Sequence, residues 1–143
     1  MKKIFLLLLV IFIIHPSYAG GIGYVDYNKI IKNYNFAKAA IHELDKKSAE
    51  IQYFLQSKEE EFSSLESPVQ KKKFEEEVQA EIAKRENAFN DFKSKRENLI
   101  NTKARAAIEK VRIDNNLDAV IDAANVYSGG VDITEKVIFY LNN

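Results

Sequence analysis

The most regular pattern in the sequence is an apolar heptad repeat within a charged segment. Nine positions between residues 37 and 65 recur at alternating spacings of four and three, and seven of them are apolar. They are Ala37, Ile41, Leu44, Ser48, Ile51, Leu55, Lys58, Phe62 and Leu65. This spacing predicts a helix with a coiled-coil seam. Pro68 ends it, because proline lacks an amide hydrogen and restricts the preceding residue, and can serve as the first residue of the next helix.

A second, looser apolar stripe follows Pro68 and extends to about Arg112. It contains Phe74, Val78, Ile82, Phe89, Phe92, Leu99, Ala104, Ala107, Ile108 and Val111. Arg85 and Arg96 fall where apolar residues are expected, as Ser48 and Lys58 do in the first stripe. The two stripes predict an antiparallel helical hairpin, or arm, over residues 37–103. Because its seams are interrupted by polar residues, we expect the arm to be loosely zipped.

The segments on either side of the arm are apolar and carry strand signals. Residues 22–26 (Ile-Gly-Tyr-Val-Asp) predict a short strand, and Asp26 or Asn28 can cap the helix that follows. Residues 117–122 predict a second strand, and Val126-Tyr127 is a candidate for another before a glycine turn.

Near the end of the chain, Asp132 and Glu135 have the spacing of a capping box, which predicts a final helix. The pattern predicts an α+β fold, mostly helical, in which the arm is inserted in a small β-rich body made of residues 20–36 and 104–143. A body of this size rarely supplies enough core to be stable without disulfides or metals, which favours an oligomer held together by the body. Its best candidates for core and subunit contacts are Ile22, Tyr24, Val120, Ile121 and Ile133.

The first 19 residues have the features of a secretory signal peptide. Lys2 and Lys3 precede eleven apolar residues, and Ser17-Tyr18-Ala19 predicts cleavage after Ala19. Eleven apolar residues are too few to span a bilayer, which needs about 20. The remaining chain has 19 basic and 21 acidic residues, a net charge of −2, so general electrostatic binding to nucleic acid is not expected.

The composition offers little for catalysis. The chain has no cysteine, and beyond the signal peptide its one histidine is His42, on a charged helix. Asp118 and Asp122 lack a basic partner nearby in the sequence and read as solvated or turn-capping residues. We therefore expect a protein that is not an enzyme and needs neither a cofactor nor a metal.

Two groups of arm residues allow more than one interpretation. The aromatic residues either zip the two helices together or form dispersed patches that hold unfolded chains; they are Tyr53, Phe54, Phe62, Phe74, Phe89 and Phe92. The lysines 71, 72 and 73, followed by three glutamates, form either a solvated helix face or a weak contact with an anionic membrane surface.

The order of these features resembles the Skp/OmpH periplasmic chaperones of Gram-negative bacteria. The resemblance rests on the signal peptide, on residues 22–26, on Leu117-Asp118-Ala119-Val120-Ile121-Asp122-Ala123 and on Val131-Asp132-Ile133-Thr134, with the charged hairpin between them. It implies a homotrimer whose three arms enclose a cavity that holds unfolded outer-membrane proteins without ATP. Members of this family are distinctly basic, so the net charge of −2 is a departure.

The resemblance and the pattern together predict an exported, periplasmic holdase whose partners are unfolded outer-membrane β-barrel proteins and further copies of itself. The competing hypothesis is a structural coiled-coil protein, a spacer or adaptor that binds one folded envelope partner. A holdase should act on several unrelated unfolded β-barrels, whereas an adaptor should ignore them.

Overall fold

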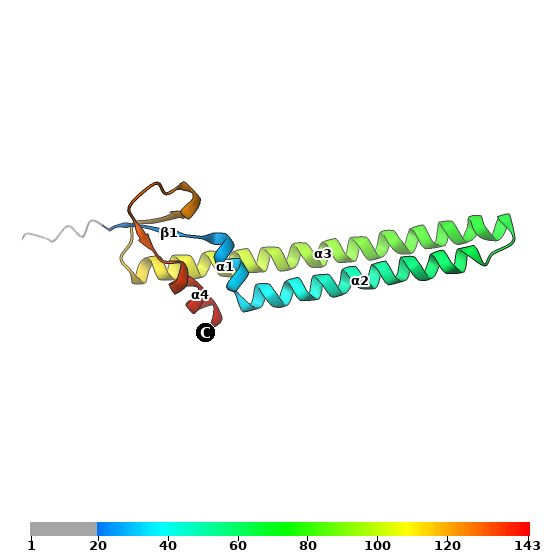
Figure 1. Cartoon of the computed structure of the whole chain (residues 1–143), viewed down its shortest axis with the longest axis horizontal. Helices are drawn as coiled ribbons and strands as arrows, with labels where there is room; N and C mark the ends of the chain where they lie inside the picture. Colours follow the sequence, from blue (N-terminus) through cyan, green and yellow to red (C-terminus); the bar gives the residue numbers. More distant parts are fainter. Residues whose placement is uncertain (1–19) are drawn as a thin grey trace, which may run out of the picture.

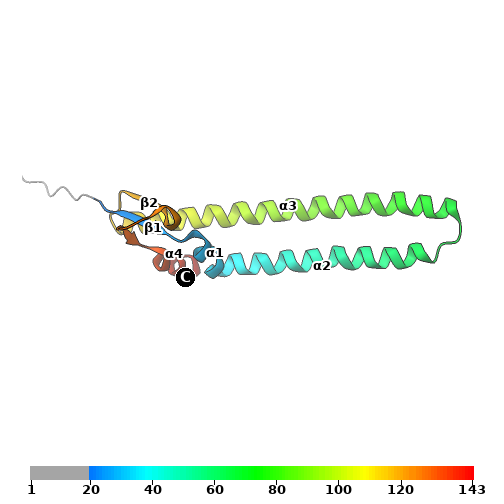
Figure 2. The same ribbon diagram turned by 45° about the horizontal axis from the view of Figure 1, so that its top comes forward.

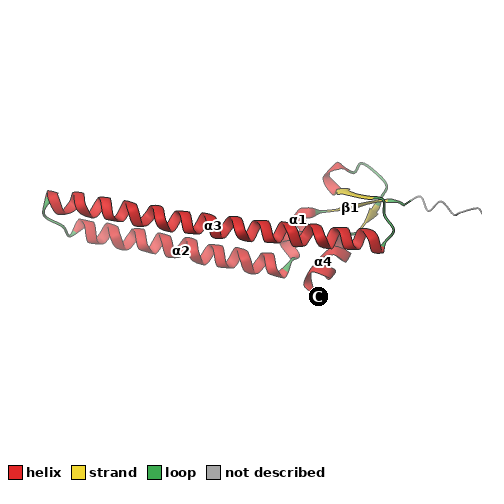
Figure 3. Cartoon of the chain, turned by 180° about the vertical axis from the view of Figure 1, so that it is seen from behind, coloured by secondary structure: helices red, strands yellow, loops and turns green. Residues whose placement is uncertain are grey.

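The computed structural model describes residues 20–143, so the predicted signal peptide lies outside the described residues. The chain has a small body at one end, from which two long helices extend side by side (Figure 1). These are α2 (Asn35–Ser63) and α3 (Pro68–Asp114), joined by a short turn at the far end. Helices dominate, and the strands gather in the body (Figure 3). The predicted α+β architecture with a long antiparallel hairpin is confirmed.

The two arm helices differ in length, because α3 continues into the body. Pro68 occupies the first turn of α3, as its sequence position predicts. The 47 residues of α3 extend about 70 Å at 1.5 Å per residue. In its last turns the side chains of Ala104, Ala107 and Val111 are buried. Figure 2 shows the last turns of α3 overlapping the strands of the body, while α2 begins beside α1. One helix therefore belongs to both the arm and the body.

The body contains one sheet of three parallel strands. The central strand β1 (Ile22–Val25) lies between β2 (Ala119–Asp122) and β3 (Val131–Asp132). The strands predicted within 22–26 and 117–122 are confirmed. Gly23 is needed on the core face of β1, since a Cβ there would lie 2.6 Å from the side chain of Leu117.

The strand considered at Val126-Tyr127 is wrong. The carboxylate of Asp122 accepts a hydrogen bond of 2.8 Å from the Ala124 amide and caps a 3-10 turn, η1 (Ala123–Asn125), that carries the chain off the sheet edge. Gly129 and Gly130 then adopt positive φ angles of 78° and 86°. Those angles return the chain to β1, so the third strand forms five residues later than predicted.

Helix α1 (Tyr27–Asn33) begins as predicted, with Asp26 as its cap. The Asp26 carboxylate accepts a hydrogen bond of 2.8 Å from the Lys29 amide. The helix stops at Tyr34, whose backbone is extended (φ −79°, ψ 117°) and whose side chain is buried. The sequence pattern did not predict this break, which separates the body from the arm.

The capping box predicted for helix α4 (Thr134–Asn142) is wrong. The carboxylate of Asp132 accepts a hydrogen bond of 2.9 Å from the backbone amide of Thr134, only two residues further on. Hydrogen bonds from the side chain and the backbone of Thr134 hold the pKa of Asp132 below its usual value. Glu135 does not reach back to the helix start; it pairs with Lys29 of α1 at 2.7 Å. Ile133, which lies between Asp132 and Thr134, is fully buried and occupies the N-cap position. The helix therefore starts one residue later than the sequence suggests.

Two apolar clusters hold the body and its junction with the arm. The body cluster comprises Val25, Ile30, Ala107, Val111, Leu117, Ile133, Val137 and Ile138. The root cluster, where the arm begins, comprises Tyr34, Ala37, Ala40 and Ile100. Leu141 of α4 packs against both, so the final helix joins them. The buried hydroxyl of Thr134 also accepts a hydrogen bond of 3.0 Å from the Asp26 amide, which ties α4 to the end of β1.

Replacing Ile133 by alanine should lower the free energy of unfolding by about 2–5 kcal/mol, because this side chain is 0% exposed and its removal leaves a cavity. The matched control is Ile113→Ala on α3, where the isoleucine is 54% exposed and the change should stay within about 0.5 kcal/mol. Urea unfolding followed by circular dichroism measures both. Equal losses in the two variants would contradict the assigned core.

Candidate functional site

The arm carries the aromatic residues that the sequence singled out, and most of them face the opposite helix. Phe54, Phe62, Phe74, Phe89 and Phe92 are half-buried, whereas Tyr53 is 73% exposed. The rings of Phe62 on α2 and Phe74 on α3 lie 6.2 Å apart between centroids, in a tilted arrangement. Five of the six residues thus lie at the helix–helix seam, and Tyr53 alone points outward.

Lysine and arginine side chains cover the aromatic rings along this seam. The closest contact joins Arg85 of α3 to Phe54 of α2, with 4.2 Å from Cζ to the ring centroid. The other pairs are Lys47–Phe92, Lys58–Phe54, Lys58–Phe74, Lys71–Phe62, Arg96–Phe92, Arg96–Phe36 and Lys103–Phe36, at 4.9–5.8 Å. Such contacts contribute about 0.5–1 kcal/mol each at exposed sites. The seam is therefore aromatic and cationic, not purely aliphatic.

This arrangement changes the interpretation of the polar seam positions. Lys58 and Arg85 were expected to be gaps in the apolar packing, but their side chains are only 31% and 38% exposed and lie over rings. Arg96 also crosses to α2, where its guanidinium lies 2.7 Å from the Glu43 carboxylate. Part of the sequence signal was available, since Lys58 on the first stripe contacts Phe74 on the second, whereas Phe54, which Arg85 contacts, lies outside the first stripe. What it lacked was the register between the two helices.

Grooves open along the arm, among them one at its tip and one at its root. The tip groove, of about 190 Å³, lies between α2 and α3 and is lined by Leu55, Lys58, Glu59, Phe62, Phe74, Glu75 and Val78. The root groove, of about 630 Å³, lies where α1, α2 and α3 meet, and its apolar lining is Ile31, Ala37, Ala40, Ile41, Leu44 and Ile100. At its edge the Tyr27 hydroxyl donates a hydrogen bond of 2.6 Å to the Asn101 side chain, and burial raises the pKa of Tyr27. Both grooves present apolar surface beside charged residues.

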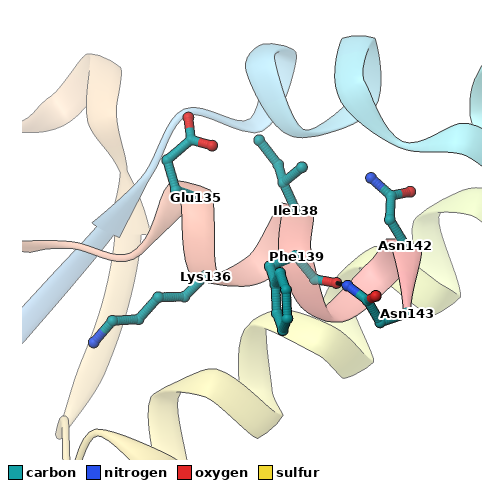
Figure 4. A pocket seen from close by; sticks show the side chains of 6 residues that line it. All are labelled: Glu135, Lys136, Ile138, Phe139, Asn142 and Asn143. Carbon is teal, nitrogen blue, oxygen red and sulfur yellow. Dashed lines mark hydrogen bonds between the residues drawn. The ribbon is translucent and has the colours of Figure 1, made fainter.

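A third hollow lies on helix α4 alone (Figure 4). Its labelled side chains come from one helix, and Phe139 is 70% exposed there. The side-chain amide of Asn143 donates a hydrogen bond of 2.7 Å to the Phe139 carbonyl at the last turn of the helix. The only acid and base that line it, Glu135 and Lys136, are engaged with Lys29 and with the Asn115 side chain respectively. Nothing here converges on a reacting group.

The face of the sheet that points away from α3 is not covered by any other part of residues 20–143. Strand alternation places Ile22, Tyr24 and Ile121 on that face, with Tyr24 beside Ile121 in the register. Ile22 is 53% and Ile121 38% exposed, and Tyr24 is half-buried. Val120 packs against the core on the other face, and Ile133 lies inside the core of the chain itself. Of the five predicted body residues, three therefore form one apolar surface patch.

The residues considered for catalysis lie apart. Asp122 caps η1, in agreement with its reading as a turn-capping residue, Asp118 lies just before β2, and His42 is exposed on α2. Within residues 20–143 no three side chains of the His, Cys, Asp or Glu type come together in a way that could hold a metal ion. Of the helices in the same range, none is both long and apolar enough to cross a membrane.

Comparisons with known proteins identify a family. A family model described as outer membrane protein (OmpH-like) matches residues 21–141. A crystal structure of a candidate outer membrane chaperone (OmpH-like) from Caulobacter crescentus CB15 is similar, with 10% identity and a TM-score of 0.41 over 86% of this chain and 84% of that one. No curated protein matches the chain.

A double-mutant cycle tests whether cation–aromatic contacts hold the arm. Phe54→Ala and Arg85→Ala should show a favourable coupling of about 0.5–1 kcal/mol in the free energy of unfolding. The reason is that either substitution alone removes the contact between the Phe54 ring and the Arg85 guanidinium. The cycle between Tyr53 and Arg85 is the control, since Tyr53 is the adjacent but exposed aromatic residue, and its coupling should be near zero. Equal couplings in both cycles would mean that Arg85 does not act through the Phe54 ring.

Proposed function

The chain belongs to the OmpH-like family, a family of chaperones, and from this premise we propose that it is an ATP-independent holdase of the periplasm. Its clients would be unfolded outer-membrane β-barrel proteins, held between arms so that they do not aggregate. The observation that carries the proposal is an arm of two long helices that extends from the body (Figure 1). Aromatic side chains lie along the seam between these helices, from Phe92 to Phe74 on α3 and at Phe54 and Phe62 on α2.

The chemistry of the arm suits weak and unselective binding. Its apolar side chains are spread in small groups, and charged residues separate them, so no single patch fixes one partner. Leu55, Val69 and Tyr53 are exposed along the arm, and the seam rings lie close behind their cations. An unfolded chain could gain several small contacts in many registers, as adaptable binding surfaces allow. This also argues against a spacer, whose partner would need one defined surface.

Export to the periplasm is part of this proposal. It is supported by the basic and apolar pattern of residues 1–19.

The holdase hypothesis is tested by diluting several unrelated β-barrel membrane proteins from urea into buffer with and without this protein. Light scattering should fall for all of them at stoichiometric amounts of protein, without ATP. A soluble protein that refolds unaided is the control, and its refolding yield should not change. Binding to one folded envelope protein with no effect on scattering would favour the adaptor.

We also propose that the chain assembles into a trimer through the uncovered face and the open edges of its sheet. Parallel sheets are stable when both faces are covered, and here Ile22, Tyr24 and Ile121 lack a covering layer within the described chain. The core of the body alone is also small for independent stability. A ring of bodies would then place the arms around a shared space.

Introducing a charge into this patch should dissociate the assembly. Ile22→Asp and Ile121→Asp should each shift the mass measured by sedimentation equilibrium toward the monomer, because a buried carboxylate without a partner is costly. Val69→Asp, an equally polar change at an exposed position of the arm, is the control and should leave the mass unchanged. A mass unaffected by the sheet variants would place the interface elsewhere.

A further inference from the structure

The charge of the arm divides sharply between its tip and the rest of α3. Residues 55–78 carry seven acids and four bases, a net charge of −3, whereas residues 79–113 carry nine bases and five acids, a net charge of +4. In this tip segment the glutamates therefore outnumber the lysines, which include lysines 71, 72 and 73. An acidic tip would repel anionic headgroups, which counts against the membrane contact considered from the sequence.

The tip groove lies within this acidic region. Leu55, Phe62, Phe74 and Val78 supply its apolar lining from both helices. Glu59 stands on the α2 side and Glu75 on the α3 side. Among residues 20–143, neither carboxylate has a lysine or arginine nitrogen within 4.0 Å. Their neighbours are already paired: Lys58 with Glu61 at 2.5 Å and Lys73 with Glu77 at 3.6 Å.

We propose that this groove binds an extended client segment in which an apolar side chain, best an aromatic one, is flanked by lysine or arginine. The inference rests on the proposed holdase function and names the kind of segment that the arm tip prefers. The apolar side chain would enter between Leu55 and Val78 and lie against the tilted Phe62–Phe74 pair. The basic residues on either side of it would reach Glu59 and Glu75.

The two lysines nearest the groove do not cancel this preference. The ammonium of Lys58 is held by Glu61 and lies 5.6 Å from the centre of the Phe74 ring, and that of Lys71 lies 5.2 Å from the centre of the Phe62 ring. Glu61 thus neutralises Lys58. Lys71 keeps its charge over the neutral Phe62 ring but is not among the side chains that line the groove. Within residues 20–143, Glu59 and Glu75 are therefore the charged lining residues without an ion-pair partner. A cationic segment is attracted by them, and an acidic segment is repelled.

The test uses the chain from residue 20 and three fluorescent peptides that share one flexible host sequence. The first has phenylalanine between two lysines, the second has phenylalanine between two glutamates, and the third has serine between two lysines. Fluorescence anisotropy at low salt should show binding of the first peptide and weaker binding of the other two. The double variant Glu59→Gln and Glu75→Gln should weaken binding of the first peptide by about 2- to 30-fold, the range for two exposed charge pairs.

The matched control is the double variant Glu60→Gln and Glu76→Gln. It removes the same two charges, one residue further along the same helices, from side chains that do not line the groove. Its affinity for the first peptide should change less than 2-fold. An equal loss in both double variants would overturn the proposal by showing a response to net charge alone. Equal affinity for the lysine-flanked and glutamate-flanked peptides would also overturn it, as would binding to anionic vesicles that competes with the peptide.

The light-scattering assay separates this proposal from the holdase function. Suppressed aggregation with unchanged peptide affinity in the Glu59→Gln and Glu75→Gln variant would leave the holdase in place and refute the groove. Selective peptide binding without any suppression of aggregation would support the groove and refute the holdase.

Discussion

The structure depends on the parallel pairing of β1 with two strands from the other end of the chain. Residues 22–25 pair with residues 119–122 on one edge and with residues 131–132 on the other. The sheet therefore joins segments that the whole arm separates in the sequence. This pairing brings α3 and α4 onto one face, where Val25, Val111 and Val137 bury each other. It leaves Ile22, Tyr24 and Ile121 on the opposite face, without a covering layer from residues 20–143. One topological constraint therefore produces both a free arm and an incomplete body.

The arm is held by a different kind of interaction from the body. The aliphatic side chains of the body cluster are buried, whereas along the seam between α2 and α3 the buried side chains are Ala37, Ala40 and Ile100 near the root. Farther out, rings and cations meet at half-exposed positions. Each such contact is weak, and fewer side chains are buried along the outer arm than in the body. Low burial of this kind is typical of segments that open locally before the core does.

Local sequence signals predicted the elements and failed where long-range contacts decide. The helices followed from the spacing of Ile51, Leu55 and Phe62, and the start of α1 from the capping aspartate Asp26. The third strand could not be placed, because residues 131–132 are extended only through pairing with β1. The break at Tyr34 is set by burial of its ring in the root cluster. These outcomes depend on neighbours more than sixty residues away.

The same limit explains what could be predicted of the binding surface. Composition identified the six aromatic residues and the lysines near Pro68, but it could not say which carboxylates remain free. That depends on which side chains pair, and here Glu61 and Glu77 take Lys58 and Lys73 while Glu59 and Glu75 do not pair. Charge that looks balanced along the chain is therefore unbalanced in space. The excess of acid beside the apolar tip groove is the feature from which the proposed preference for cationic segments is argued, because opposite charges across an interface favour specificity.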